Sequence, residues 1–163
     1  MVREALLDEG LLLRGCEVTR MARGGPGGQH ANKTASAIRL THRPTGLTAS
    51  AGEHREGAAN RRAALDRLRL ELACTQRGCA DPAWLHQHVR GGRLHCGPTA
   101  SSWPLVIAVL LDLFAEAKGS LREAAAEARL NTTQVAKALT ADPTVRAAAD
   151  GIRARHGLSR LRV

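Results

Sequence analysis

Four glycines and a proline precede a single glutamine in the sequence Arg23-Gly24-Gly25-Pro26-Gly27-Gly28-Gln29-His30-Ala31-Asn32-Lys33. Residues without a side chain allow the backbone to approach a ligand closely and to adopt positive φ angles. The polar and basic residues after the glutamine are suited to hold an RNA end. A glycine cluster alone is more often a flexible hairpin tip, so the flanking residues have to decide between these interpretations.

The residues on both sides of this stretch predict strands. Residues 16–22 should form one strand, and residues 38–41 alternate apolar and polar side chains at the period of two expected of a half-buried strand. Residues 43–46 carry proline and glycine at positions that favour a turn. They should therefore join this strand to residues 47–51 as a hairpin.

A long helix is predicted over residues 55–73. Its apolar stripe consists of Leu65, Leu68 and Leu72. A second row, spaced by seven residues, consists of Arg55, Arg62 and Arg69. Such a row is ordinarily a solvated face, but in a protein that binds RNA, contact with phosphate groups is an equally good interpretation.

The rest of the chain predicts helices. After a linker at 76–81, a short helix is expected near 83–89, then a glycine-rich turn at 91–92 and a helix that begins near Pro104. Three further helices are expected after the capping residues Ser120, Asn131 and Asp142. Gly157 should end the last helix. The apolar positions of this trihelical cluster are Leu121, Ala125, Ala128, Leu130, Val135, Leu139, Val145 and Ile152.

The predicted fold class is therefore α+β. Residues 1–78 should form a small, mostly antiparallel sheet with one long helix, and residues 79–163 should form an all-α helical domain. A net charge of +9 indicates an acidic partner, for which nucleic acid is the usual candidate. The N-terminus resembles neither a secretion signal nor a transit peptide, and the most apolar stretch, 105–115, is too short to cross a bilayer. We expect a cytoplasmic protein without membrane contact, whose cysteines stay reduced.

The glycine-rich loop and the hairpin after it together carry a longer pattern of residue types. The pattern consists of Gly25-Pro26-Gly27-Gly28-Gln29-His30, Asn32-Lys33-Thr34, Ser36-Ala37-Ile38 and Leu40-Thr41-His42-Arg43-Pro44-Thr45-Gly46. It resembles the catalytic domain of class I peptide chain release factors and of short, release-factor-like ribosome-rescue peptidyl-tRNA hydrolases, from about residue 16 to about residue 69. Two positions depart from the family: Ala31 replaces the usual valine and Arg23 a usual small residue.

The resemblance implies a set of site residues. Gly27, Gly28 and Gln29 would be catalytic: the Gln29 backbone N–H makes the main contact, its side chain shapes the water site, and the glycines permit the backbone conformation. Backbone donors of this kind contribute roughly 10²–10³ in rate without a titrating side chain. His30 has a weaker case as a general base, because the sequence places no second catalytic group beside it. The expected RNA-binding residues are Arg23, His30, Asn32, Lys33, Arg39, Arg43, Arg55 and Arg62.

The implied function is codon-independent hydrolysis of the peptidyl-tRNA ester on the ribosome, most simply to rescue stalled complexes. The partners would be the peptidyl transferase centre of the large ribosomal subunit and peptidyl-tRNA. We expect the protein to act as a monomer and to need no metal or cofactor. One rival is a ribosome- or RNA-binding protein without activity. Another is a DNA-binding regulator, because residues 121–139 also fit a helix-turn-helix, although its second helix carries a single cation, Lys137.

A zinc site is a further alternative. The ligand types available are Cys74, Cys79, His86, His88, His95 and Cys96. The spacing between the two leading cysteines does not fit the usual zinc fingers. Buried or incidental residues are therefore the preferred interpretation of this set.

Overall fold

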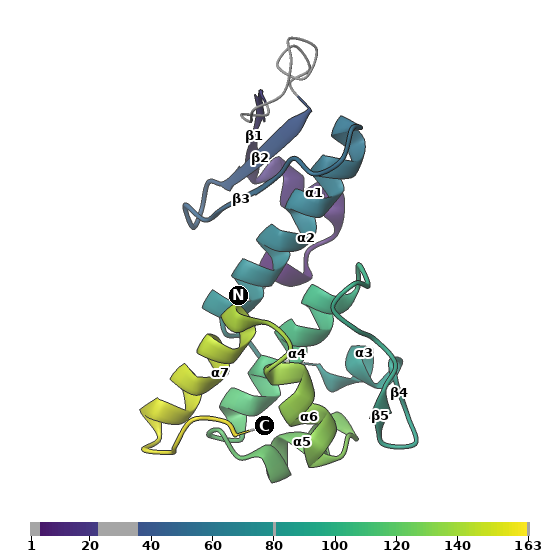
Figure 1. Cartoon of the computed structure of the whole chain (residues 1–163). Coiled ribbons are helices and arrows are strands. Elements are labelled where there is room, and N and C mark those ends of the chain that lie inside the picture. The colour runs from purple at the N-terminus through teal and green to yellow at the C-terminus, as the bar shows by residue number, and fades with distance from the viewer. Residues whose placement is uncertain (1–3, 23–35, 80, 163) are drawn as a thin grey trace. The chain divides into compact units, whose positions relative to one another are not determined.

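The computed structural model describes residues 4–22, 36–79 and 81–162 (Figure 1). The chain divides into two compact units. One consists of Leu7–Glu71, and the other of Met1–Leu6 together with Leu72–Val163. We call them the N-terminal unit and the C-terminal unit. The sequence predicts a domain boundary after residue 78, and that boundary stays a prediction. The division between the two compact units falls between residues 71 and 72, inside a helix.

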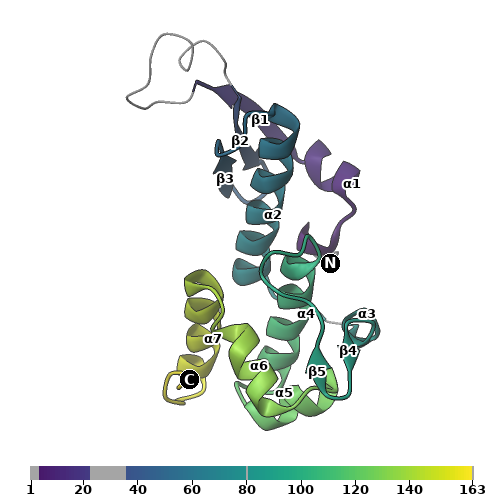
Figure 2. The same ribbon diagram turned by 45° about the vertical axis from the view of Figure 1, so that its right-hand side comes forward.

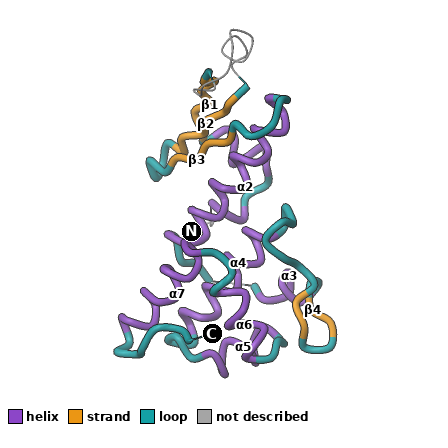
Figure 3. Tube along the Cα trace, in the orientation of Figure 1, coloured by secondary structure: helices purple, strands orange, loops and turns teal. Residues whose placement is uncertain are grey.

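The N-terminal unit begins with helix α1 (Glu9–Arg14) and continues with strands β1 (Cys16–Met21), β2 (Ala37–His42) and β3 (Thr48–Ala51). The strands form one antiparallel sheet in the order β1-β2-β3, drawn in orange in Figure 3. Helix α2 (Gly57–Thr75) follows. The predicted α+β class with a small antiparallel sheet is therefore confirmed for the described residues.

Alternation along β2 places its apolar side chains in the core of this unit. Ile38 and Leu40 are buried, whereas Arg39 between them is exposed, as the period of two predicts. On α2, Leu65 and Leu68 are buried as well. The predicted turn after β2 is also present, because the His42 N–H donates to the Leu47 carbonyl at 2.8 Å.

Helix α4 (Trp103–Glu116) is the apolar centre of the C-terminal unit. Most of its side chains are buried, and it contacts the 3₁₀ turn η1 (Glu4–Leu6), α3 (Pro82–His86), α5 (Leu121–Ala128), α6 (Thr132–Leu139) and α7 (Pro143–Arg155). Seen from the angle of Figure 2, α7 and α3 lie on opposite sides of α4. A helix that is apolar almost all round is stable only when other elements surround it.

The prediction of an all-α C-terminal region is wrong in one place. Residues 89–94 form a hairpin of two short strands, β4 (Val89–Arg90) and β5 (Arg93–Leu94). The two residues between them, Gly91 and Gly92, have φ angles of 55° and 71°. Two consecutive positive φ angles are the signature of the tight turn whose twist matches that of paired strands. The glycine pair therefore closes a hairpin rather than a simple turn.

The predicted helix caps are confirmed. Ser120 Oγ accepts from the Glu123 N–H at 3.4 Å, Asn131 Oδ1 from the Gln134 N–H at 2.8 Å, and Asp142 Oδ1 from the Thr144 N–H at 2.7 Å. Each such cap stabilises a helix by about 1 kcal/mol. Of the predicted apolar positions of the cluster, all are buried except Leu121, which is half-buried.

A buried acidic side chain fixes the segment that follows α2. Asp112 on α4 is 1% exposed and accepts from the Gly78 N–H at 3.1 Å. Arg77 lies 3.8 Å from the same carboxylate oxygen and donates to the Ala73 carbonyl at 2.7 Å. The residues predicted to be a linker are thus attached to α4 within the C-terminal unit. In the described part of the chain, no helix combines the length and apolar character needed to span a membrane.

Candidate nucleic-acid interface and loop support

Most of the site residues expected from the sequence lie outside the described residues. These are Arg23, Gly27, Gly28, Gln29, His30, Asn32 and Lys33. The strands that lead to and from this segment are described. Met21 at the end of β1 is directly opposite Ala37 at the start of β2. The antiparallel ladder therefore brings the two ends of the Gly-Gly-Gln segment, residues 22 and 36, next to one another.

Arg39 occupies the middle strand on the solvent side of the sheet. It is paired with Thr19 of β1 and Ser50 of β3 and is exposed. Among the described residues, its guanidinium forms no ion pair. Directly opposite cross-strand neighbours have Cβ atoms within about 5.5 Å, so hydroxyl groups flank this cation. The arrangement suits contact with a phosphate group.

The other described arginines of the expected RNA-binding set are also exposed. Arg43 lies in the turn after β2, where its N–H donates to the Gly15 carbonyl at 2.9 Å. Arg55 lies just before α2, and Arg62 lies on that helix. All three side chains are accessible to a ligand, but the structure gives no contact that joins them into one surface.

The arginine row on α2 is not uniformly exposed, and its interpretation as a solvated or phosphate-binding row is wrong for Arg69. This side chain is 7% exposed. Burial lowers the pKa of the Arg69 guanidinium, while the nearby carboxylates of Asp66 and then Glu9 offset part of that effect. A seven-residue spacing drifts by only about 20° per repeat around a straight helix, so Arg62 and Arg69 lie on nearly the same side of α2. The burial of Arg69 therefore comes from the groups packed around it, and Arg55 precedes the helix altogether. Arg69 therefore cannot contact phosphate.

Asn60 is the residue that sequence reasoning missed. It lies on α2, is fully buried, and forms three hydrogen bonds with backbone groups. Its Nδ2 donates to the Ser36 carbonyl at 2.7 Å and to the His54 carbonyl at 2.9 Å, and its Oδ1 accepts from the His54 N–H at 2.9 Å. Ser36 is the first described residue after the Gly-Gly-Gln segment. Asn60 therefore ties one end of that segment to the long helix.

A sequence signal for Asn60 exists. The residue falls four and eight positions before Ala64 and Leu68, both fully buried, and so shares their stripe of the helix. A polar side chain in a buried stripe has to find hydrogen-bond partners. Asn60 satisfies that requirement with the backbone of two separate loops.

A second contact from α2 holds the end of β3. Arg67 donates to the Ser50 carbonyl at 2.6 Å and forms an ion pair with Glu53 at 2.6 Å. The Gly52 N–H, which donates to Glu53 Oε2 at 3.0 Å, is the main reason that the pKa of this carboxyl lies below its ordinary value. Arg67 is therefore occupied within the unit, unlike Arg39.

The candidate zinc ligands do not converge in the part of the chain that the structure describes, where no group of three or more His, Cys, Asp or Glu residues is placed to hold a metal. His86 Nε2 instead contacts the Glu127 carbonyl at 2.9 Å, and Cys96 Sγ contacts Ser102 Oγ at 3.3 Å. These side chains thus connect elements of the C-terminal unit.

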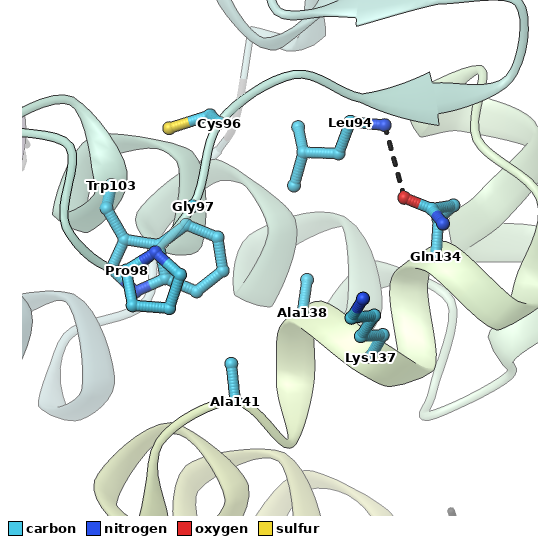
Figure 4. Close-up of a pocket in the computed structure, with 9 residues that line it drawn as sticks. All are labelled: Leu94, Cys96, Gly97, Pro98, Trp103, Gln134, Lys137, Ala138 and Ala141. Carbon is cyan, nitrogen blue, oxygen red and sulfur yellow. Dashed lines mark hydrogen bonds between the residues drawn. The ribbon is translucent and has the colours of Figure 1, made fainter.

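A small cavity of about 210 Å³ lies between β5, residues 96–98 and α6. Figure 4 shows the Leu94 side chain and the Trp103 ring facing Ala138 and Ala141 across it, with the Gln134 side chain hydrogen-bonded to the Leu94 N–H. The walls are mainly apolar. The cavity therefore marks the side of the hairpin that faces the interior of the unit.

Comparison with known proteins assigns the N-terminal part of the chain. Residues 14–86 match the RF-1 domain model. A stretch of 56 residues is 48% identical to Peptide chain release factor 1 of Caldicellulosiruptor saccharolyticus and covers 34% of this chain and 16% of that protein. A stretch of 54 residues is 48% identical to Peptide chain release factor 2 of Treponema pallidum. It covers 33% of this chain and 15% of that protein.

The similarity is local. The chain spans only 15–16% of the length of these curated relatives, and no solved structure matches it. The matched residues include β1, β2, β3, α2 and the Gly-Gly-Gln segment between the first two strands. Over residues 14–86 the chain is therefore similar to class I peptide chain release factors.

Proposed function

We propose that this protein hydrolyses the ester bond of peptidyl-tRNA on the ribosome, independently of the codon, and thereby rescues stalled complexes. The observation that carries the proposal is the RF-1 domain match over residues 14–86, which includes Gly27-Gly28-Gln29. The named relatives are peptide chain release factors. Codon independence is the finer part of the proposal, and the release assay described below tests it.

The proposed chemistry needs no titrating side chain. Water attacks the ester carbon, and negative charge develops on the ester oxygens. Backbone N–H groups that point at this charge stabilise it, and in the proposal the Gln29 N–H has this role while Gly27 and Gly28 permit the necessary backbone conformation. The ladder between Met21 and Ala37 and the Asn60 hydrogen bonds support the segment from both sides.

The partners belong to the same proposal. The Gly-Gly-Gln segment would act as part of a monomer in the peptidyl transferase centre of the large subunit, in the cytoplasm, with peptidyl-tRNA as substrate. Arg39, Arg43, Arg55 and Arg62, all exposed, would contact ribosomal RNA or tRNA phosphates together with the residues of the segment itself.

A release assay tests the proposal. Purified ribosomes carry labelled formyl-methionyl-tRNA in the P site, and the A site is either empty of mRNA or filled with a sense or stop codon. We expect release of labelled formyl-methionine with an empty A site. Release that requires a stop codon would contradict codon independence. Ribosome binding without release would favour the non-catalytic alternative.

Charge reversal tests the RNA-binding residues. Changing Lys33, Arg39 and Arg43 to Glu should weaken ribosome or tRNA binding and reduce the slope of log K against log salt by about 2, because each phosphate contact releases counterions. Binding measured between low and physiological salt gives this slope. The matched control reverses three exposed arginines of the C-terminal unit, Arg122, Arg155 and Arg160. If both triple variants behave alike, Lys33, Arg39 and Arg43 form an ordinary solvated surface.

A DNA-reading function is the second candidate, because α5 and α6 contact one another and are joined by the turn at residues 129–131. The exposed residues of α6 include Thr132, Thr133 and Lys137. With a single cation on this helix, Lys137→Ala should change nucleic-acid binding less than twofold. A base contact of a true reader is worth about 1–3 kcal/mol. A titration in which one duplex binds a thousandfold more tightly than random DNA would support the regulator instead.

A further inference from the structure

The hairpin β4–β5 has one basic face and one apolar face. Val89 is paired with Leu94, and Arg90 with Arg93. The ladder continues through the His95 N–H, which donates to the His88 carbonyl at 2.8 Å. Because residues two apart share a face of a strand, His88, Arg90, Arg93 and His95 lie on the same face.

The opposite face is turned toward the interior of the C-terminal unit. Leu94 lines the cavity with Trp103 and Ala138 (Figure 4). Arg90, Arg93 and His95 are exposed, whereas Val89 and Leu94 are half-buried. The face with the two arginines and two histidines is therefore the face that solvent and ligands can reach.

An aromatic ring adjoins this basic face. The centroids of the Trp84 and His88 rings are 4.8 Å apart, with an angle of 52° between the ring planes. Trp84 belongs to α3 and is half-buried, so the residue is partly accessible to solvent. We name Trp84, His88, Arg90, Arg93 and His95 the hairpin surface.

The hairpin surface carries uncompensated positive charge. Residues 82–111 contain no Asp or Glu, and among the described residues neither Arg90 nor Arg93 takes part in an ion pair. Like charges directly opposite each other destabilise a pair of strands. An anion bound between the two guanidinium groups would remove this repulsion.

The surface is held in place by the helices beside it. The Asn131 N–H at the start of α6 donates to the Gly92 carbonyl at 3.1 Å, and the Leu94 N–H donates to Gln134 Oε1 at 3.4 Å. On the other side, His86 of α3 contacts the Glu127 carbonyl of α5. A rigid surface loses little conformational entropy when it binds a ligand.

We propose that the hairpin surface binds single-stranded RNA. Stacking of a base on an aromatic ring beside cations that contact the backbone is the arrangement that recognises single strands. In a duplex the bases are already stacked on one another, so no base is free to stack on the Trp84 ring. This binding goes beyond the proposed peptide release and involves no residue of the Gly-Gly-Gln segment.

The first test measures the charge contribution in the full-length protein. Fluorescence anisotropy with a labelled single-stranded RNA 12-mer is compared for the wild type, Arg90→Glu/Arg93→Glu and a matched control. The control, Arg155→Glu/Arg160→Glu, changes exposed positions at the end of α7 and after it, and α7 lies on the opposite side of α4 from α3 (Figure 2). We expect the hairpin variant to bind at least tenfold more weakly and to lose about 1.4 from the salt slope, at about 0.7 per phosphate contact. Equal weakening in both variants would overturn the proposal.

The second test uses the two tryptophans as reporters. Trp103 is 4% exposed, whereas Trp84 is half-buried, so a stacked base should quench the emission of Trp84. The quenching should persist in Trp103→Phe and disappear in Trp84→Phe. Trp84→Ala should weaken RNA binding roughly 5- to 100-fold, as the loss of a stacked base does. Unchanged affinity in Trp84→Ala would overturn the stacking role.

Further measurements identify the preferred ligand and distinguish RNA binding from peptide release. Duplex RNA bound as tightly as single-stranded RNA would overturn the preference for single strands, and tighter binding of a single-stranded DNA 12-mer would assign the surface to DNA. Gly28→Ala, expected to be inactive in release, should bind the RNA 12-mer like the wild type. Loss of RNA binding in that variant would contradict the independence of the hairpin surface. A wild type that binds the 12-mer but releases no peptide would refute only the release proposal.

Discussion

Gly28→Ala is expected to lower ribosome-dependent peptide release by at least about 100-fold, because the proposed mechanism loses a correctly oriented backbone donor. A Cβ atom at a position that needs glycine conformations is sterically disfavoured. Ribosome binding and the unfolding temperature should change little. Release of labelled formyl-methionine under single-turnover conditions measures the effect.

Gly57→Ala is the matched control for this experiment. Gly57 begins α2, does not have a positive φ angle, and has no atom within 4 Å of the place where a Cβ would be. It should therefore release peptide like the wild type. Gln29→Ala keeps the backbone N–H and should lose less activity than Gly28→Ala. A larger loss in Gln29→Ala would place the chemistry in the side chain, and full activity in Gly28→Ala would refute the mechanism.

Asn60→Ala is expected to have the second-largest effect, on stability and on release together. The substitution removes three hydrogen bonds of a fully buried side chain and leaves the Ser36 and His54 backbone groups without this partner. Unsatisfied buried groups make a loss of about 2–4 kcal/mol reasonable. Release per folded molecule should also fall, because the end of the Gly-Gly-Gln segment at Ser36 is no longer tied to α2. Urea unfolding and the kcat of release measure the two effects.

Leu68→Ala separates positioning from stability. Leu68 is fully buried on the same stripe of α2. Its truncation should cost about 2–5 kcal/mol and keeps the hydrogen bond between Asn60 and the Ser36 carbonyl. At a temperature where both variants are folded, Leu68→Ala should keep the wild-type kcat and Asn60→Ala should not. Hydrogen exchange of the His54 amide, whose N–H donates to Asn60, tests the Asn60 hydrogen bonds without a release assay. Unchanged protection of that amide in Asn60→Ala would contradict their stabilising role.

The sheet and the capped helices were predictable because their signals are local. The alternation around Arg39 depends on the period of two within a strand, and Ser120, Asn131 and Asp142 each cap a helix through a backbone N–H two or three residues away. Signals of this kind are present in the sequence before any tertiary contact forms. The same holds for the turn after β2.

The missed features depend on residues far apart in the chain. The sequence shows Asn60 only as a polar residue on an apolar stripe, and its partner, the Ser36 carbonyl 24 positions earlier, is brought to it by the fold. The burial of Arg69 could not be predicted from its seven-residue spacing, because it depends on the groups that pack around that part of α2. The hairpin at 89–94 has only two residues per strand, too few for a periodic pattern, and is held by Asn131 and Gln134.

The contacts of the Asp112 carboxylate determine where the chain can be truncated without destabilising the C-terminal unit. Removing everything before residue 79 would take away Arg77 and Gly78, which contact a side chain that is 1% exposed. Removing one partner of a buried charge costs several kcal/mol. A separately expressed C-terminal unit therefore has to begin no later than Leu72, so that it keeps the last turn of α2, and it also loses the packing of Ala5 if residues 1–6 are absent.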